Sequence, residues 1–297
     1  MSNKFHESIR AEGMTNAIEV TGLAKKYKNF ALENISFSIP RGYISGFIGQ
    51  NGAGKTTTFK VLTGMTSKAG GKVKILDRPP DDVCIKEELG VLFDQPYFQE
   101  EWTPADIERV LRPFYSRWNS AAFYGYLKKF SIEPGLRFKT FSRGMKMKLG
   151  LAAALSHDAK LLLLDEPTGG LDPVIREEVL QILREYMTDE ERSIFFSTHI
   201  TSDLEKIADY IVYIHKGKII FSGAKDELME KYCVIRGSTG EISPQKRAEI
   251  IGMREHIGGF DGLISIANLK NLPPGVIAEA ASLDDIMVFV SGEDGKL

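Results

Sequence analysis

The sequence of 297 residues contains few cysteines and no long apolar run. Its two cysteines, Cys84 and Cys233, form neither a C-x-x-C pair nor a His/Cys metal spacing, so we expect no disulfide framework and no zinc site. No stretch approaches the roughly 18 apolar residues of a membrane span, and the first ten residues lack the apolar core of a signal peptide. The sequence therefore predicts a protein that is cytoplasmic or peripheral to a membrane.

An excess of charge of one sign is also missing. The chain has 38 Lys and Arg against 40 Asp and Glu, which gives a net charge of -2. This balance does not support a nucleic acid as the main partner, although it does not exclude local basic patches. Hydrophobic residues make up 43% of the chain, so it can bury a sizeable core in one large or two modest domains.

A glycine-rich loop is the most informative feature that is present. It follows a short apolar strand expected over 43–48 and precedes a helix expected to begin at residue 58. It fits the pattern G-x-x-x-x-G-K-[ST], with the sequence Gly49-Gln50-Asn51-Gly52-Ala53-Gly54-Lys55-Thr56-Thr57. In such a loop the backbone N–H groups converge on phosphates, Lys55 places a positive charge between the β- and γ-phosphates, and Thr56 offers its hydroxyl to Mg²⁺. The loop predicts a nucleoside triphosphate site. A glycine-rich turn that merely contains a lysine is the weaker interpretation, because strand and helix stand where the motif needs them.

Charged side chains follow two apolar strands farther along the chain. Asp165 and Glu166 end a run of four leucines, and His199 follows the next predicted strand. Ligand sites lie at the carboxyl ends of parallel strands, so we expect these side chains to face the phosphates. Asp165 would hold Mg²⁺ through a water, Glu166 would orient or deprotonate the attacking water, and His199 would contact the γ-phosphate or that water. Capping of the next helix is the weaker explanation for the two carboxylates, because Pro167 follows at once.

Gln95 ends another apolar run, at the point where the pattern becomes helical. An amide at this position can ligate Mg²⁺ and can also report the γ-phosphate to the helices that follow. An isolated glutamine carries no such signal, so this assignment depends on the other site residues.

Hydrophobic periodicity predicts how the chain is organised around these residues. Strand-like alternation over 17–39 predicts an antiparallel set, and alternating strands and helices over 161–208 predict a parallel sheet covered on both faces. An aromatic-rich helical pattern over 96–155 indicates an insertion. A hairpin is expected to turn near Gly217.

In this order, the residues resemble the nucleotide-binding subunits of ATP-binding-cassette (ABC) transporters. The resemblance covers roughly residues 17–231 and includes an aromatic, the phosphate loop, a glutamine loop, a signature, the Asp-Glu strand, a Leu-Asp loop and a switch histidine. It implies an α/β P-loop NTPase of the ABC ATPase fold, with a mixed β-sheet core and an antiparallel β subdomain. The expected parts are an N-terminal extension (1–16), the ATPase domain (17–230) with an inserted helical subdomain (96–155), and a small C-terminal α+β accessory subdomain (231–297).

The resemblance also implies roles for residues that carry no signal by themselves. Tyr27 stands where the family's aromatic stacks on adenine, the alternative being an ordinary strand tyrosine. Asp172 stands in the loop that crosses to a partner subunit, and it can also cap the helix ahead of Pro173. The expected ATP-binding residues are Tyr27, Gly49, Gln50, Asn51, Gly52, Ala53, Gly54, Lys55, Thr56, Thr57, Ser142, Gly144 and Asp172, and the expected Mg²⁺ ligands are Thr56, Gln95 and Asp165.

The signature departs from the family's usual Leu-Ser-Gly-Gly-Gln, since residues 141–145 read Phe-Ser-Arg-Gly-Met. Ser142 and Gly144 match, whereas Arg143 and Met145 do not. The family's Ser and Gln are spaced as a capping box, so Ser142 should cap its helix unaided, with a loss of a few tenths to about 1 kcal/mol. The anion site should survive, because it uses the Ser hydroxyl and backbone N–H groups. Arg143 either adds positive charge beside an opposed γ-phosphate or lies in solvent, and solvent is favoured because long cations usually lie there.

Partners follow from the same resemblance. The signature of one subunit faces the phosphate loop of another in this family, so a chain with one copy of each should form a homo- or heterodimer around two ATP molecules. Without a membrane span, the chain would need separate membrane-spanning subunits, docked on the helical insertion around 98–141, and would lie on the inner face of the cell membrane. Residues 282–289 look like an ending common in ATPase subunits of bacterial exporters, which favours export over import.

Two other classes of protein are alternatives. A non-transport ABC ATPase that acts on ribosomes or DNA usually carries two cassettes or a long coiled coil, and this chain shows one cassette and no sustained heptads. A small GTPase would need an N-K-x-D guanine-reading motif, which the sequence lacks.

Overall fold

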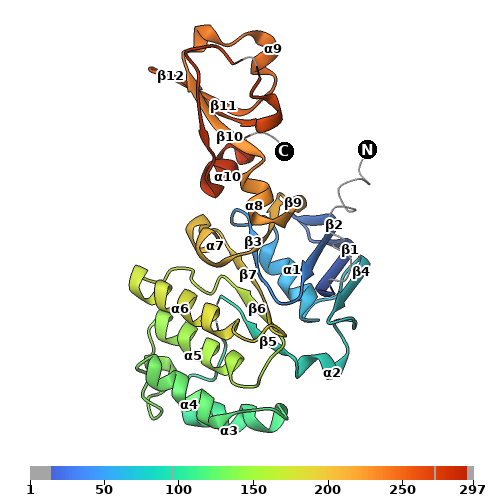
Figure 1. Cartoon of the computed structure of the whole chain (residues 1–297). Helices are drawn as coiled ribbons and strands as arrows, with labels where there is room; N and C mark the ends of the chain where they lie inside the picture. Colours follow the sequence, from blue (N-terminus) through green and yellow to red (C-terminus); the bar gives the residue numbers. More distant parts are fainter. Residues whose placement is uncertain (1–14, 95, 271, 293–297) are drawn as a thin grey trace.

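The computed structural model describes residues 15–94, 96–270 and 272–292, which form three sheets along an elongated molecule (Figure 1). The central sheet has six strands in the order β5-β6-β7-β3-β8-β9. The first five are parallel, and β9 is antiparallel to β8. Its members are β3 (Ile44–Ile48), β5 (Leu89–Leu92), β6 (Leu161–Asp165), β7 (Ser193–Thr198), β8 (Tyr210–His215) and β9 (Lys218–Ala224).

The two strands that lead to the predicted catalytic residues Glu166 and His199 lie inside this sheet. Every residue of β6 and β7 is buried, as continuous apolar runs predict for parallel strands covered on both faces. Their register places Asp165 opposite Ser197. The carboxyl ends of β6 and β7 therefore meet at one edge of the sheet, and the predicted hairpin turn at Gly217 is present between β8 and β9.

A three-stranded antiparallel sheet packs against one face of the central sheet. Its order is β2-β1-β4, with β1 (Asn16–Lys26), β2 (Ala31–Pro40) and β4 (Gly70–Ile75). Between the two sheets lies α1 (Lys55–Leu62), the helix that follows the phosphate loop. Phe59 of α1 stacks on Phe195 of β7 with the ring centroids 5.2 Å apart, and Phe47 of β3 lies beside them. This aromatic core fixes the phosphate loop relative to β6 and β7.

Helices cover the other face of the central sheet. They are α5 (Arg143–Leu155), α6 (Pro173–Tyr186) and α7 (Thr201–Ile207), which share one hydrophobic core with the sheet. That core continues into the aromatic-rich insertion, where α3 (Pro104–Leu111) and α4 (Ser120–Lys129) form one end of the molecule (Figure 1). Three short helices join other parts of the chain: α2 (Val83–Lys86), α8 (Lys225–Met229) and α9 (Pro244–Arg247).

The C-terminal residues form a four-stranded antiparallel sheet at the opposite end, in the order β11-β12-β10-β13. Its strands are β10 (Tyr232–Gly237), β11 (Ile250–His256), β12 (Gly259–Ser265) and β13 (Ile277–Ala280). The final helix, α10 (Leu283–Gly292), packs between this sheet and α7, within the same buried cluster as the helices of the ATPase core. The Leu283 N–H donates to Glu205 Oε1 at 3.0 Å. The expected α+β subdomain thus shares its core with its neighbour, and the exact domain boundaries stay predictions.

Among the described residues, none of the helices has both the length and the apolar character needed to cross a bilayer.

Candidate nucleotide site

The phosphate loop joins β3 to α1 and borders a cavity of about 540 Å³. Gly52 and Gly54 have φ angles of 81° and 115°, a left-handed backbone that favours glycine. Gly54 is also the N-cap of α1, so the helix begins at Lys55, a turn earlier than its apolar pattern shows. The cavity is lined by Asn29, Phe30, Asn51, Gly52, Gly54, Lys55, Thr56, Thr57, Asp94 and Glu166.

Lys55 is a nearly buried cation at the centre of this loop. Its side chain is 5% exposed, and Nζ donates to the carbonyl oxygens of Gly49 at 2.6 Å and Gln50 at 3.3 Å. Nζ also lies 3.2 Å from Glu166 Oε1. A desolvated cation beside a helix N-terminus favours bound anions, so the loop has the local charge that a phosphate group needs.

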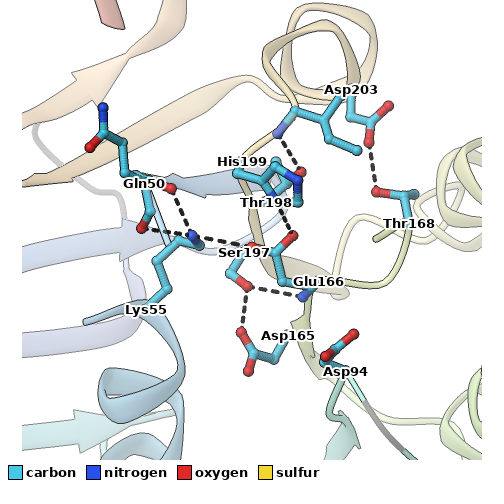
Figure 2. A network of polar contacts seen from close by, with 12 residues as sticks. Gln50, Lys55, Asp94, Asp165, Glu166, Thr168, Ser197, Thr198, His199 and Asp203 are labelled. Carbon is cyan, nitrogen blue, oxygen red and sulfur yellow. Dashed lines mark hydrogen bonds and ion pairs between the residues drawn. The ribbon is translucent and has the colours of Figure 1, made fainter. Parts of the chain in front are cut away.

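Glu166 connects the phosphate loop to the end of β7. Its second carboxylate oxygen, Oε2, lies 2.8 Å from His199 Nδ1, as Figure 2 shows. Glu166 has a φ of 53°, which is unusual for a residue with a side chain, and its N–H donates to Ser197 Oγ at 2.9 Å. The structure thus brings Lys55, Glu166 and His199 together, as the sequence predicted, with Glu166 in the middle. A carboxylate held in this way by a cation and an imidazole can accept a proton from a water.

Asp165 is the buried carboxylate of the site. Ser197 Oγ donates to its Oδ1 at 2.5 Å, whereas Oδ2 is buried and has no hydrogen-bond partner among the described residues. Burial raises the pKa of Asp165, and the hydrogen bond from Ser197 opposes that rise, as does the nearby Thr56 hydroxyl. An orphaned carboxylate oxygen beside the Thr56 hydroxyl fits a hard cation such as Mg²⁺. The described residues contain no group of three or more His, Cys, Asp or Glu that could hold a metal ion.

A second buried network, which the sequence analysis missed, links the loop after β6 to α7. Asp203 is fully buried and accepts hydrogen bonds from Thr168 Oγ1 at 2.6 Å and from Arg176 Nε at 2.5 Å. Figure 2 shows Asp203 above His199, near the start of α7. The network fixes the loop that begins with Glu166 against the helix that begins just after His199. Ser197 was also missed, although its place in the strand that leads to His199 was a usable signal.

The altered signature begins α5 as the sequence predicted. The Ser142 side chain accepts from the Met145 N–H at 3.2 Å, and no reciprocal capping-box bond forms. Arg143 is half-exposed, but it does not simply lie in solvent: Nη2 is 2.6 Å from Asp94 Oδ1. The expectation that Arg143 lies free in solvent therefore needs correction, because the Asp94 carboxylate, which belongs to another loop, binds its guanidinium.

Other predicted site residues lie at the margins of the cavity or outside it. Tyr27 is 44% exposed and is not among the residues that line the cavity, where Asn29 and Phe30 lie instead, so its adenine role stays a prediction. Asp172 caps α6, accepting from the N–H groups of its second and third residues at 3.1 Å. Gln95 lies outside the described residues.

A second cavity, of about 730 Å³, opens between the edge of the central sheet and the helical insertion. It shares Asp94 and Thr56 with the first cavity and also reaches Asp165. Most of its wall is apolar or aromatic, and its lining comprises Thr56, Lys60, Met65, Val91, Leu92, Phe93, Asp94, Pro96, Tyr97, Phe98, Leu111, Tyr115, Gly150, Ala153, Ala154, His157 and Asp165.

Comparison with known proteins agrees with this geometry. The family model described as ABC transporter matches residues 32–169. The bacitracin transport ATP-binding protein BcrA of Bacillus licheniformis is 31% identical over 265 residues, which are 84% of this chain and 82% of that protein. The fluoroquinolones export ATP-binding protein of Mycobacterium tuberculosis is 30% identical over 293 residues, 94% of each chain. An uncharacterised ABC transporter ATP-binding protein of Nostoc is 33% identical over 223 residues. The match covers 70% of this chain and 64% of the length of that protein.

Solved structures show the same fold. The structure of an ATP-binding subunit of an ABC transporter has a TM-score of 0.65 and 27% identity, and the match covers 72% of this chain and 92% of that one. A dimeric ATP-binding cassette bound to ADP and Pi has a TM-score of 0.62 at 21% identity, over 70% of this chain and 98% of that one. The chain belongs to the ATP-binding subunits of ABC transporters, whose activity is ATP hydrolysis. The comparisons do not support the ribosomal alternative.

Proposed function

We propose that this ATPase subunit powers export of a substrate through separate membrane-spanning subunits, by ATP-driven closure of a dimer. The observation that carries the proposal is the convergence of Lys55, Glu166 and His199 at the ends of β6 and β7 beside the phosphate loop. Two relatives that match most of the chain support export as the direction of transport, since their names state bacitracin transport and fluoroquinolone export.

Within one subunit, the chain's own residues bind and activate. Lys55 and the loop N–H groups would hold the β- and γ-phosphates, and Thr56 and Asp165 would hold Mg²⁺, with Gln95 as the predicted further ligand. Bound Mg²⁺ supplies charge neutralisation on the phosphate oxygens. Glu166, held by His199 at 2.8 Å, would take the proton of the attacking water.

A second subunit is needed to complete each site. Ser142 and Gly144 are not among the residues that line the cavity at this chain's own phosphate loop. Ser142 is the N-cap of α5, and the positive end of this helix suits an anion presented by another chain. Ser142, Gly144 and Asp172 would therefore act on the ATP of the partner, and the dimer would close around two ATP molecules.

The second cavity supports docking of a membrane-spanning partner. Its wall carries the exposed ring of Tyr97, which is 96% exposed, together with Phe98 and Leu111. The same cavity reaches Thr56 and Asp165, so a partner segment in it would lie close to the proposed metal ligands. Docking here would place the protein on the inner face of the membrane, with its helical insertion toward the partner.

Fractionation of cells tests this function. We expect the chain to sediment with membranes only when its cognate membrane subunit is co-expressed, and Tyr97→Asp to weaken that association while ATP binding is kept. Phe114→Asp is the matched control, because Phe114 is an exposed aromatic of the same insertion that does not line the cavity. Co-sedimentation with ribosomes or DNA, or equal effects of the two substitutions, would contradict the proposal.

A further inference from the structure

A third carboxylate lies in the wall of the nucleotide cavity, beside the two that the site uses. Asp94 lines the cavity with Lys55 and Glu166, and it lines the second cavity with Asp165. Figure 2 shows its side chain below Glu166, on the side of Asp165. A negative charge at this position would repel the phosphates that the loop binds, because like charges weaken binding when they are placed close together.

Arg143 opposes that charge. Its Nη2 lies 2.6 Å from Asp94 Oδ1, although the two residues are 49 positions apart. The guanidinium also packs on the backbone of Gly170, where an added Cβ would lie 2.8 Å from Nη1. Contacts from the end of β5 and from the loop after Glu166 therefore hold Arg143 in place from two sides.

The exposure of the Arg143–Asp94 ion pair limits its effect on stability, and its place in the cavity wall gives it an electrostatic effect. The side chains of Arg143 and Asp94 are 55% and 42% exposed, and an exposed pair of this kind contributes little to stability. Its influence is on the electrostatic potential of the cavity wall, where a triphosphate would bring several negative charges.

We propose that Arg143 neutralises Asp94 and thereby sets the affinity of this subunit's own phosphate loop for nucleotide. The inference rests on the proposed nucleotide cavity. It gives the unusual residue of the signature a role within its own chain, distinct from contact with the ATP of an opposing subunit. The two roles predict different behaviour when the charge of Asp94 is removed.

Binding of a fluorescent, non-hydrolysable ATP analogue to the purified full-length chain tests the inference. Arg143→Ala should raise Kd about fivefold, since it leaves Asp94 uncompensated near the phosphates. Asp94→Asn alone should bind as tightly as the original chain or more tightly, and the double variant Arg143→Ala/Asp94→Asn should return to about the original Kd. The defect of Arg143→Ala should shrink as salt rises. Arg137→Ala is the matched control, since Arg137 is a similarly exposed arginine of the same subdomain, paired with Glu101.

Other outcomes overturn the inference. If Arg143→Ala binds normally, Arg143 does not affect the cavity. If the double variant binds as weakly as Arg143→Ala, or if Asp94→Asn alone weakens binding, Arg143 acts on phosphate directly or Asp94 has another role. Lys55→Ala separates this inference from the assignment of the nucleotide cavity. If Lys55→Ala binds the analogue normally, the cavity is not the nucleotide site. If Lys55→Ala loses binding but the Arg143 and Asp94 variants do not behave as predicted, only the proposal that Arg143 neutralises Asp94 is overturned. Circular dichroism of each variant establishes that it is folded.

Discussion

Glu166 combines an unfavourable backbone with a side chain that the proposed chemistry needs. Its φ of 53° costs a residue with a Cβ about 1–2 kcal/mol relative to glycine. The backbone N–H of Glu166 donates a hydrogen bond to Ser197 Oγ, and its carboxylate contacts Lys55 and His199. These interactions hold the residue in this conformation. Backbone strain of this kind is often found where a catalytic side chain has to be aimed.

We predict that Glu166→Gly has a free energy of unfolding about 1 kcal/mol larger than that of Glu166→Ala, because only glycine relieves the backbone. Both variants lack the carboxylate, so both should hydrolyse ATP at least about 10²-fold more slowly than the original chain. Urea unfolding and a phosphate-release assay measure the two effects. Equal stability of the two variants would mean that the strain is absent, and normal hydrolysis would remove Glu166 from the mechanism.

His157 gives a pH dependence at the residue scale. It is 2% exposed, its Nε2 lies 3.0 Å from the Leu89 carbonyl oxygen, and its ring stacks on Tyr115 with centroids 4.0 Å apart. Burial lowers the pKa of His157 below its ordinary 6.5, and hydrogen bonds to the backbone carbonyls of Leu89 and Ala153 oppose this shift. The unfolded chain therefore takes up the proton first as pH falls.

The stability that the neutral His157 ring contributes is thus present above about pH 6.5 and is lost as pH falls toward the lowered pKa of the folded state. We expect the original chain to lose more stability between pH 7 and pH 5.5 than His157→Gln, whose amide can still donate to the Leu89 carbonyl. Chemical unfolding at a series of pH values measures the difference. Parallel pH profiles for the two proteins would contradict it.

Single residues also show where sequence reasoning stops. Lys55, Asp165, Glu166 and His199 were predictable because each stands next to a recognisable strand or loop. The partners of Arg143 and Asp203 were not, since they lie between 27 and 49 positions away and meet only through the folded sheet and helices. Arg143 was expected in solvent because a long cation carries no local sign of its partner.

At the scale of elements, apolar runs and turn residues predicted most of what positions the site. The leucines of β6 and the apolar run of β7 were correct as buried parallel strands. The predicted start of α1 was too late in the sequence. The helix already includes Lys55 to Thr57, which show no apolar pattern. The residue that would stack on adenine was less predictable: Tyr27 was expected there, but Phe30 lines the cavity and Tyr27 does not, so the role of Tyr27 stays a prediction.

The incomplete cap of α5 leads to a prediction at the element scale. Met145→Gln supplies the acceptor that a capping box needs and should stabilise the chain by a few tenths to about 1 kcal/mol, whereas Ser142→Ala should cost about 1 kcal/mol. Met145→Leu is the control, since it keeps the apolar character without adding an acceptor. Thermal unfolding measures all three, and a Met145→Gln variant no more stable than Met145→Leu would show that the box does not form.

At the scale of the whole molecule, the C-terminal subdomain is not an independent appendage. Ile286 of α10 is fully buried in the cluster that also includes Leu204 of α7, and Trp102 and Trp118 pack against that cluster at the other end. Patterning predicted a small α+β unit here, but only the structure shows that α10 shares its core with the ATPase domain.

Ile286→Ala should therefore lower the stability of the whole chain by about 2–5 kcal/mol. The two tryptophans, both in the helical insertion, report unfolding far from the substitution. We expect their fluorescence transition to shift together with circular dichroism at 222 nm, as cooperative unfolding requires. A tryptophan transition that does not move would mean that the C-terminal subdomain unfolds separately.

The central claim is that each chain carries one half of a composite ATP site, with the phosphate loop on one subunit and Ser142 on the other. The most direct test is the mass of Glu166→Gln in solution by analytical ultracentrifugation, with and without ATP, because this variant should bind ATP but hydrolyse it poorly. We predict that ATP shifts Glu166→Gln from monomer to dimer, and that adding Ser142→Arg abolishes the shift while ATP binding remains. A Glu166→Gln protein that binds ATP yet stays monomeric, alone and with its membrane subunit, would contradict it.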